Sequence, residues 1–237
     1  MTGLAERLRD ALERGHRRRP ILLEGDVLEG ADNDLTPAAV LVAVVDHRSP
    51  TVILTERPKT MRRHPGQISF PGGRIDPEDD GPVAAALREA EEEIALPRDC
   101  VEVIGAADLY RTVTGFEVTP IVGVVPPGLD LEPQPGEVAA MFEAPLHYLL
   151  DPRHQMVRTA LWQGRERSYY EIEWEGRRIW GATAAMIVNL SRRLELDQEK
   201  WEPMNRPSCP RHDCRLPGAV CTCSFRSDQA TTKETGL

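Results

Sequence analysis

The chain has 237 residues, of which 41% are apolar and 28% charged, and its formal net charge is −9. This composition is typical of a soluble protein with a sizeable core, and the acidic balance disfavours a nucleic-acid-binding surface. No apolar run approaches the roughly 20 residues that a membrane-spanning helix requires, and the N-terminus lacks the apolar segment of a signal peptide. We therefore expect a cytoplasmic protein that binds neither nucleic acid nor membrane.

The first part of the chain predicts one helix and then a strand pair. Apolar residues recur at helical spacing over 4–14, so residues 1–35 are expected to form a helix and a lead-in to a main domain at 36–200. The apolar run 38–45 and the β-rich run 51–55 flank a short turn. This pattern predicts a hairpin at the centre of a sheet.

Strands and helices then interleave without a strict βαβ repeat, which favours an α/β fold with helices packed on a mixed sheet. Pro120 stands early in the predicted strand 117–125, and a proline there favours an edge strand or a bulge. The other expected elements are a helix at 82–96, strands at 101–106, 109–114 and 137–143, a short helix at 145–150, a hairpin at 168–174 and 177–180, and a closing helix at 182–196.

A basic segment broken by Pro and Gly separates the predicted hairpin from the helix at 82–96. It contains Arg57, Lys59, Arg62, Arg63 and His64, which would suit an anionic ligand. The alternative is surface charge that balances the acidic residues nearby. The segment by itself does not decide between the two.

Residues 89–93 include four glutamates. Neighbouring like charges destabilise a helix by a few tenths of a kcal/mol per pair, and the later turns of a helix favour cations. Glu89, Glu92 and Glu93 share one face by their spacing, so a divalent cation is the simplest ligand that would offset their repulsion. The alternative is a salt-bridged surface helix, but no lysine occurs between residues 60 and 199 to alternate with the acids.

A second face of the same helix is expected to pack on the core. Val83, Leu87, Ala90 and Ile94 recur at spacings of four and three residues, which predicts a buried stripe.

Residues 73–96 resemble the Nudix box. The match is closest from Arg88 through Glu93. Ala95 stands where the family has Gly, Gly73 is one residue further from Arg88 than in the general pattern, and the family's early glutamate has no match, since Asp79 and Asp80 bracket its place.

This resemblance implies a Nudix-type α/β/α sandwich with a mixed sheet and a catalytic loop–helix–loop. It implies Mg²⁺ or Mn²⁺ ligation by Glu89, Glu92 and Glu93, and a role for Arg88 in orienting the carboxylates. One glutamate would act as general base, and Glu89 and Glu137 are the candidates, between which the sequence does not choose. Glu137 can also be explained as a polar residue where a loop meets a strand.

Further segments resemble the coenzyme A pyrophosphatase branch of the family. They are Leu54–Arg57, Arg62 through Gly73, Thr114–Pro120 and Ile179–Ala184, so the resemblance extends over about residues 36–196. It implies hydrolysis of coenzyme A or acyl-CoA to 3′,5′-ADP and 4′-phosphopantetheine. The candidate substrate-binding residues are Arg57, Arg62, His64, Gln67, Gly72 and Gly73.

Two other functions remain open at this point. One is hydrolysis of a different nucleoside diphosphate derivative, such as ADP-ribose or NADH. The other is a non-catalytic ligand sensor, against which the intact Glu89, Glu92 and Glu93 count. Neither oligomeric state nor acyl-chain preference follows from the sequence.

Four of the five cysteines lie after residue 208. An odd number in this arrangement is not a disulfide framework. Cys209, Cys214, Cys221 and Cys223 could hold a structural Zn²⁺, although their spacing is not the usual one for such a site. The alternative is a reduced, disordered tail over residues 201–237.

Overall fold

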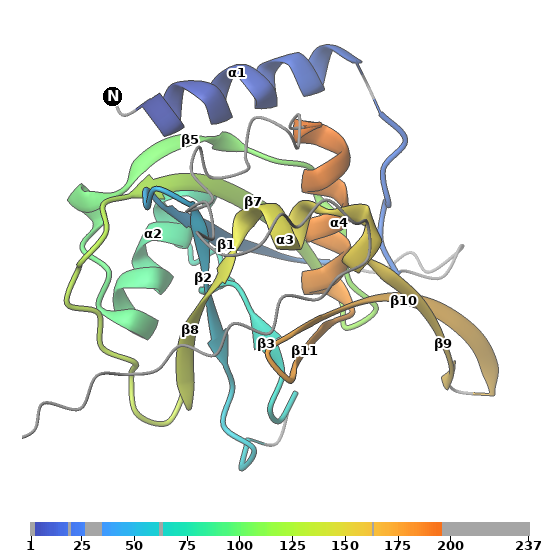
Figure 1. Ribbon diagram of the computed structural model, residues 1–237. Coiled ribbons are helices and arrows are strands. Elements are labelled where there is room, and N and C mark those ends of the chain that lie inside the picture. The colour runs from blue at the N-terminus through green and yellow to red at the C-terminus, as the bar shows by residue number, and fades with distance from the viewer. Residues whose placement is uncertain (1–2, 19, 27–34, 62–63, 163, 196–237) are drawn as a thin grey trace, which may run out of the picture. The chain divides into compact units, whose positions relative to one another are not determined.

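A mixed sheet of eight strands contains the hairpin that the sequence predicts (Figure 1). Strands β1 (Thr36–Val45) and β2 (Thr51–Glu56) pair antiparallel across a short turn. Strand β7 (Phe116–Val125) runs parallel to β1 along its whole length. These three long apolar strands place the hairpin in the interior of the sheet, as expected.

Shorter strands complete this sheet, and a second sheet of three strands follows it in the chain. The order in the large sheet is β3-β2-β1-β7-β5, with β4 on β1, β6 on β7 and β8 on β2. The remaining strands are β3 (Ile68–Ser69), β4 (Gly72–Arg74), β5 (Glu102–Ala106), β6 (Tyr110–Arg111), β8 (Ala140–Pro145), β9 (Met156–Trp162), β10 (Arg165–Trp174) and β11 (Arg177–Trp180).

The helices are α1 (Gly3–Arg18), α2 (Gly81–Ile94), α3 (Leu146–Leu150) and α4 (Ala182–Leu194). This computed structural model describes residues 3–18, 20–26, 35–61, 64–162 and 164–195. The chain divides into two units, 1–203 and 204–237, and every described residue lies in the first. Within the described ranges, no helix is long and apolar enough to cross a membrane.

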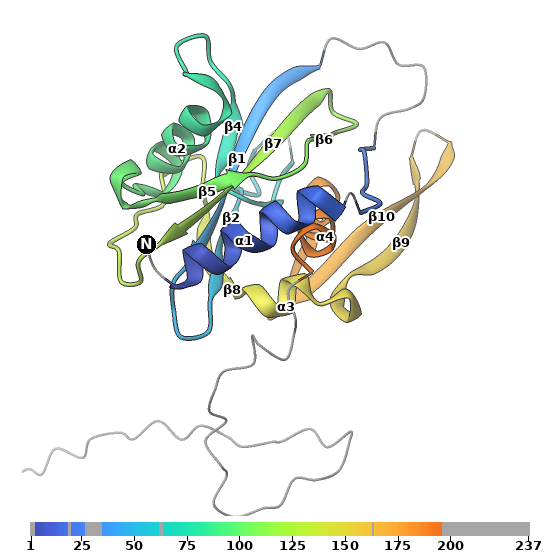
Figure 2. The same ribbon diagram turned by 90° about the horizontal axis from the view of Figure 1, so that it is seen from above.

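The strict alternation of β1 creates two cores, one on each face of the large sheet. Ala39, Leu41 and Ala43 pack with α2, whereas Val42 and Val44 belong to the core that contains α1 and α4. Figure 2 shows the sheet between these helices. The α/β/α sandwich expected from the sequence is therefore confirmed.

Helix α2 buries most of the predicted stripe: Ala90 and Ile94 are buried, and Leu87 is partly buried against the core. Its buried apolar residues are Ala85, Ala86, Ala90 and Ile94, while Val83 is 37% exposed. By its spacing Val83 shares the face of Ala90 and Ile94, but it stands in the first turn of the helix, where this face stays partly exposed. The prediction was thus wrong for Val83.

Strand β7 is not an edge strand, because β1 pairs along one side and β5 and β6 pair along the other. Pro120 faces the gap between β5 and β6, where its carbonyl accepts a hydrogen bond from the Ala107 amide at 2.8 Å. The missing N–H of proline is tolerated there because the ladder is interrupted at that point.

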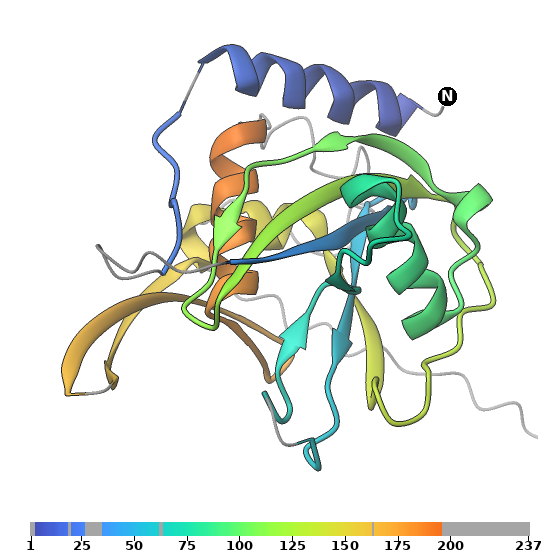
Figure 3. The same ribbon diagram turned by 180° about the vertical axis from the view of Figure 1, so that it is seen from behind.

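Strand β9 is the longest of the strands that the sequence did not reveal, the others being β3 and β4. Its side chains from Met156 through Leu161 are all exposed, so no alternation of buried and exposed positions marks it as a strand. Its pairing with β10 extends the predicted hairpin into a three-stranded sheet, which Figure 3 shows beside the main sheet.

Helix α1 is held to α4 by a buried arginine. Arg193 Nη1 donates to the Gly15 carbonyl at 2.6 Å, and its Nε donates to Asp108 at 2.8 Å. Gly15 allows this contact, because a Cβ at that position would overlap the carbonyl oxygen of Arg193 and lie 2.7 Å from its Cδ.

We therefore expect Gly15→Ala to destabilise the protein by about 1–3 kcal/mol through overpacking. Helix propensity alone gives the opposite sign, since alanine is favoured over glycine by about 1 kcal/mol in a helix interior. Urea denaturation measures the difference. Gly3→Ala is the control, because a Cβ at Gly3 meets nothing within 4 Å. A stabilised Gly15→Ala variant would show that the close contact between Gly15 and Arg193 does not require glycine.

Candidate active site

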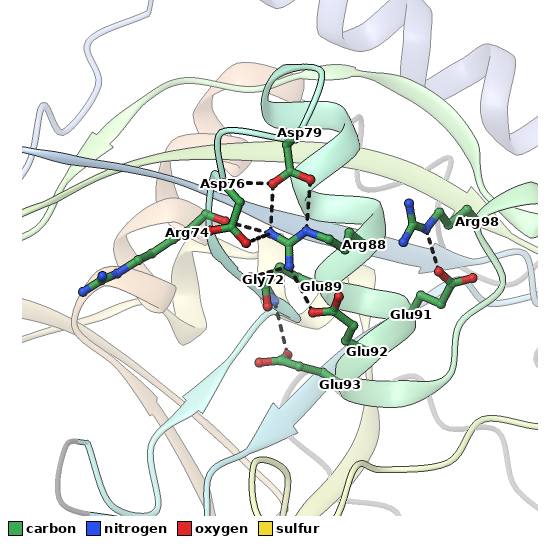
Figure 4. Close-up of polar contacts among 10 residues, drawn as sticks. All are labelled: Gly72, Arg74, Asp76, Asp79, Arg88, Glu89, Glu91, Glu92, Glu93 and Arg98. Carbon is green, nitrogen blue, oxygen red and sulfur yellow. Dashed lines mark hydrogen bonds and ion pairs between the residues drawn. The ribbon is translucent and has the colours of Figure 1, made fainter.

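Strand β4 and the loop after it run along one face of α2 (Figure 4). Glu89, Glu92 and Glu93 point from the helix toward this segment, while Glu91 points the other way and binds Arg98. The Gly72 amide donates to Glu93 Oε2 at 3.2 Å. The expected grouping of three carboxylates on one helical face is thus present.

The Arg88 guanidinium lies at the centre of the acidic residues. Its Nε and Nη2 donate to the two oxygens of Asp79 at 3.0 and 2.9 Å. Its Nη1 donates to Glu89 at 3.2 Å and to Glu92 at 3.0 Å, and Nη2 also reaches the Arg74 carbonyl at 3.0 Å. This arginine offsets the repulsion between Glu89 and Glu92 and fixes one oxygen of each.

Asp79 is the residue that sequence reasoning missed. The sequence left the place of the family's early glutamate without a match, bracketed by Asp79 and Asp80, and in the structure Asp79 is the bidentate partner of Arg88. This pairing holds the pKa of the Asp79 carboxyl below its usual value, and the Asp76 amide, which donates to Asp79 at 2.8 Å, adds to the effect. The available signal was the acidic pair immediately before the helix.

Burial dominates the electrostatics of the two inner glutamates. Glu93 is 7% exposed, and its burial raises its pKa to about 7, opposed by the Gly72 amide and by the Arg57 guanidinium. Glu137 and Glu89 raise it further. The pKa of Glu89 is also raised, chiefly by burial, with Arg88 opposing. Arg57 and Glu137 therefore lie close enough to Glu93 for their charges to act on it.

Two loops bring these residues to α2. At the end of β2, the Arg57 amide donates to the Gln67 carbonyl at 3.0 Å, which closes the basic segment on itself. On the other side, the Gln134 amide donates to the Glu93 carbonyl at 2.8 Å, and the Ala139 amide donates to the Glu56 carbonyl. Exposed Glu137 lies in the loop between these two attachments.

The other predicted residues have mixed outcomes. His64 is exposed and adopts a left-handed backbone with φ of 54°, and the Gln67 amide donates to its carbonyl at 3.2 Å. Arg62 lies outside the described residues. The same is true of the candidate zinc ligands Cys209, Cys214, Cys221 and Cys223.

Gly72 and Gly73 belong to strand β4 rather than to a loop, and both are paired with β1. A Cβ at Gly73 would lie 2.5 Å from Cδ of Glu89, so the glycine leaves room for that carboxylate. A Cβ at Gly72 would lie 2.6 Å from Cα of Val40, in the backbone of β1. A side chain at Gly72 would thus crowd the backbone of β1, and one at Gly73 would crowd the Glu89 carboxylate.

Ala95 ends α2 in the left-handed conformation, with φ of 53° and ψ of 31°. Its amide donates to the Glu91 carbonyl at 3.0 Å. Glycine is favoured at such a helix terminus because it has no Cβ to crowd the backbone. The structure therefore explains the family's glycine at this position and shows that alanine adopts the same cap here.

The described residues contain no cluster of three or more His, Cys, Asp or Glu side chains already gathered tightly enough to hold a metal. The chemistry of the donors nevertheless fits a hard divalent cation. One oxygen each of Glu89, Glu92 and Glu93 is engaged by Arg88 or Gly72, so the other oxygen is what each would offer. Two of the three are desolvated carboxylates with raised pKa values, which a cation would neutralise.

Burial of Glu93 predicts a pH-dependent stability in metal-free protein. The pKa is about 7 in the folded state, against an ordinary value of 4.5 for glutamate, so the folded state binds the proton more tightly. Stability from this group is therefore greatest below pH 4.5 and is lost as the pH rises to about 7. The glutamine of the Glu93→Gln variant does not titrate. The free energy of unfolding of this variant relative to the parent should therefore rise by at most about 3 kcal/mol between pH 4.5 and 8. Urea unfolding in chelator measures this; a pH-independent difference would contradict it.

Residues 35–163 match the NUDIX domain family. The chain belongs to the Nudix hydrolase family. A Nudix hydrolase of Photorhabdus laumondii, named NudL and described as uncharacterized, is 40% identical over 159 residues, covering 67% of this chain and 85% of the relative. NudL of Citrobacter koseri, likewise described as uncharacterized, is 42% identical over 154 residues, covering 65% and 80%.

Among solved structures, an Ap4A hydrolase of C. elegans superposes with a TM-score of 0.41 at 19% identity, covering 46% of this chain and 80% of that one. The assignment to the family rests on the sequence relatives and not on this likeness. As a Nudix hydrolase, the protein is an enzyme that hydrolyses nucleoside diphosphate derivatives, and the carboxylate face of α2 lies within the matched residues.

Proposed function

We propose that this Nudix hydrolase cleaves the diphosphate of coenzyme A, or of acyl-CoA, to 3′,5′-ADP and 4′-phosphopantetheine. The observation that carries the proposal is that one loop is attached both to the carboxylate helix and to the start of the basic segment: the Gln134 amide donates to the Glu93 carbonyl, and the Ala139 amide donates to the carbonyl of Glu56, next to Arg57. The Arg57 guanidinium also opposes the rise in the pKa of Glu93 that burial causes. A cationic segment beside an acidic face suits a substrate that has both a diphosphate to be cleaved and a further phosphate to be held.

On this proposal Glu89, Glu92 and Glu93 hold Mg²⁺ or Mn²⁺. When bound, the metal neutralises the diphosphate and lowers the pKa of a water. Arg88 orients Glu89 and Glu92 through its hydrogen bonds to both. Either Glu89 or Glu137 would accept the proton of the attacking water. The absence of a side chain at Gly73 leaves space beside Glu89.

The phosphates would be held from the other side of the site. Coenzyme A carries a 3′-phosphate on its ribose in addition to the diphosphate. We assign Arg57, His64 and Gln67, together with Arg62, to contacts with these groups. The hydrogen bonds between the Arg57, Gln67 and His64 backbones support this assignment, because they hold the three residues in one segment.

A product assay over a panel of nucleotides tests the proposal. Coenzyme A, NADH, ADP-ribose and nucleoside triphosphates are each incubated with enzyme and Mg²⁺ or Mn²⁺, and the products are separated by chromatography. Release of 3′,5′-ADP from coenzyme A, at a kcat/KM above those of the other substrates, is expected. Turnover of ADP-ribose or NADH without turnover of coenzyme A would replace the proposed substrate while retaining the proposed metal site.

A further inference from the structure

The first turn of helix α4 contains a threonine, Thr183, whose hydroxyl reaches strand β3, just after the basic segment. Thr183 Oγ1 donates to the Ile68 carbonyl at 3.0 Å. Both residues are 3% exposed, so this hydrogen bond is shielded from water. Thr183 belongs to the segment Ile179–Ala184, which contributes no residue to the carboxylate face or to the proposed phosphate contacts.

A glycine turn places this threonine. Gly181 has φ of 64° and ψ of −135°, a conformation that residues with a Cβ rarely adopt. Its amide donates to the Tyr170 carbonyl at 3.1 Å, and its carbonyl accepts from the Ala185 amide at 2.9 Å. The turn between β11 and α4 is thereby tied at both sides, and Thr183 lies in the first turn of the helix.

Ile68 in turn supports the ends of the basic segment. It pairs with Glu56 in the register of β2 and β3, next to the hydrogen bond between the Arg57 amide and the Gln67 carbonyl. Strand β3 has two residues and lies at the end of the sheet order, so β2 holds it from one side. The hydrogen bond from Thr183 is an additional attachment of this short strand, made by α4.

We propose that Thr183 is a positioning residue for substrate binding. By holding Ile68, it sets the position of Arg57 and Gln67 relative to Glu93. The inference rests on the proposed function for the roles of Arg57 and Gln67 in contacting phosphate. Because Thr183 does not touch the carboxylates, its loss should weaken substrate binding and leave the chemical step intact.

Steady-state kinetics with coenzyme A test this role. Thr183→Val keeps the shape and removes the donor, and we expect KM to rise about five- to tenfold with kcat within about twofold of the parent. Thr183→Ser keeps the hydroxyl and should restore the parent KM. Thr183→Ala replaces the valine variant if that one does not fold.

The matched control is Ser191→Ala, because Ser191 Oγ on the same helix donates to the Leu150 carbonyl at 2.7 Å, away from the basic segment. This variant loses a comparable hydrogen bond and should keep the parent KM. An equal rise in KM for Ser191→Ala, or an unchanged KM for Thr183→Val, would overturn the proposal. A fall in kcat as large as the rise in KM would do the same.

Amide hydrogen exchange without substrate separates this inference from the proposed function. The Arg57 and Gln67 amides are both hydrogen-bonded within the segment, so Thr183→Val should speed their exchange about five- to tenfold, and Ser191→Ala should not. If the parent does not hydrolyse coenzyme A, the proposed function fails and exchange decides the role of Thr183. Unchanged exchange at both amides would refute it.

Discussion

Replacing Glu93 by glutamine is expected to lower kcat by at least about 100-fold, because changes even to outer-sphere partners of a metal cost 10- to 100-fold. The amide keeps the shape of the side chain but offers a cation no negative charge. The carboxylate is already desolvated, with its pKa raised to about 7, so the fold itself does not need its charge. Folding should therefore survive the change, and turnover should not.

Glu91→Gln is the control for this experiment. Glu91 lies one helical turn or less from the other glutamates, but it points away from them and pairs with Arg98 at 2.7 Å. Its replacement should leave kcat within about twofold of the parent, because exposed ion pairs contribute little. Titration with Mn²⁺ provides a second measurement. If Glu93→Gln retained both parent activity and parent Mn²⁺ affinity, Glu93 would not be a ligand.

The second large effect is expected from substitutions of the neighbouring glycines Gly72 and Gly73, one of which should change stability and the other activity. Gly73→Ala should reduce kcat about 10- to 100-fold, because its Cβ displaces the Glu89 carboxylate from its position. Stability should change by less than about 1 kcal/mol, since a flexible side-chain end can move aside. Gly72→Ala should instead destabilise the protein by about 2–4 kcal/mol, because its Cβ meets the backbone of β1 at a φ of 154°.

Urea denaturation and kcat measured on both variants distinguish the two effects. The expected pattern is a stable protein with low activity for Gly73→Ala and an unstable protein for Gly72→Ala. Two variants with the same loss of stability and activity would show that β4 acts as a single structural unit. In that case Gly73 would not have the separate role of leaving space for Glu89.

The carboxylate face could be predicted because it lies within one helix. The spacing of Glu89, Glu92 and Glu93 determines that they share a face wherever the helix packs. The same local logic predicted the β1–β2 hairpin. The family resemblance identified the box and the sandwich in advance, and the relatives confirm the family.

Contacts between distant segments could not be read from such patterns. Asp79 became the partner of Arg88 through the path of the loop, and Val83 remained partly exposed in the first turn of α2. The partners of Pro120 depended on where β5 and β6 stop. In each case the sequence supplied a residue with more than one possible environment.

By itself, then, the sequence determined the charge of the site, its helical face and the family to which the chain belongs. Tertiary structure alone decided which charges act on Glu93, because Arg57 and Glu137 come from loops that no local periodicity describes. It also decided the raised pKa of Glu93, since burial depends on what packs over the helix and not on the helix itself.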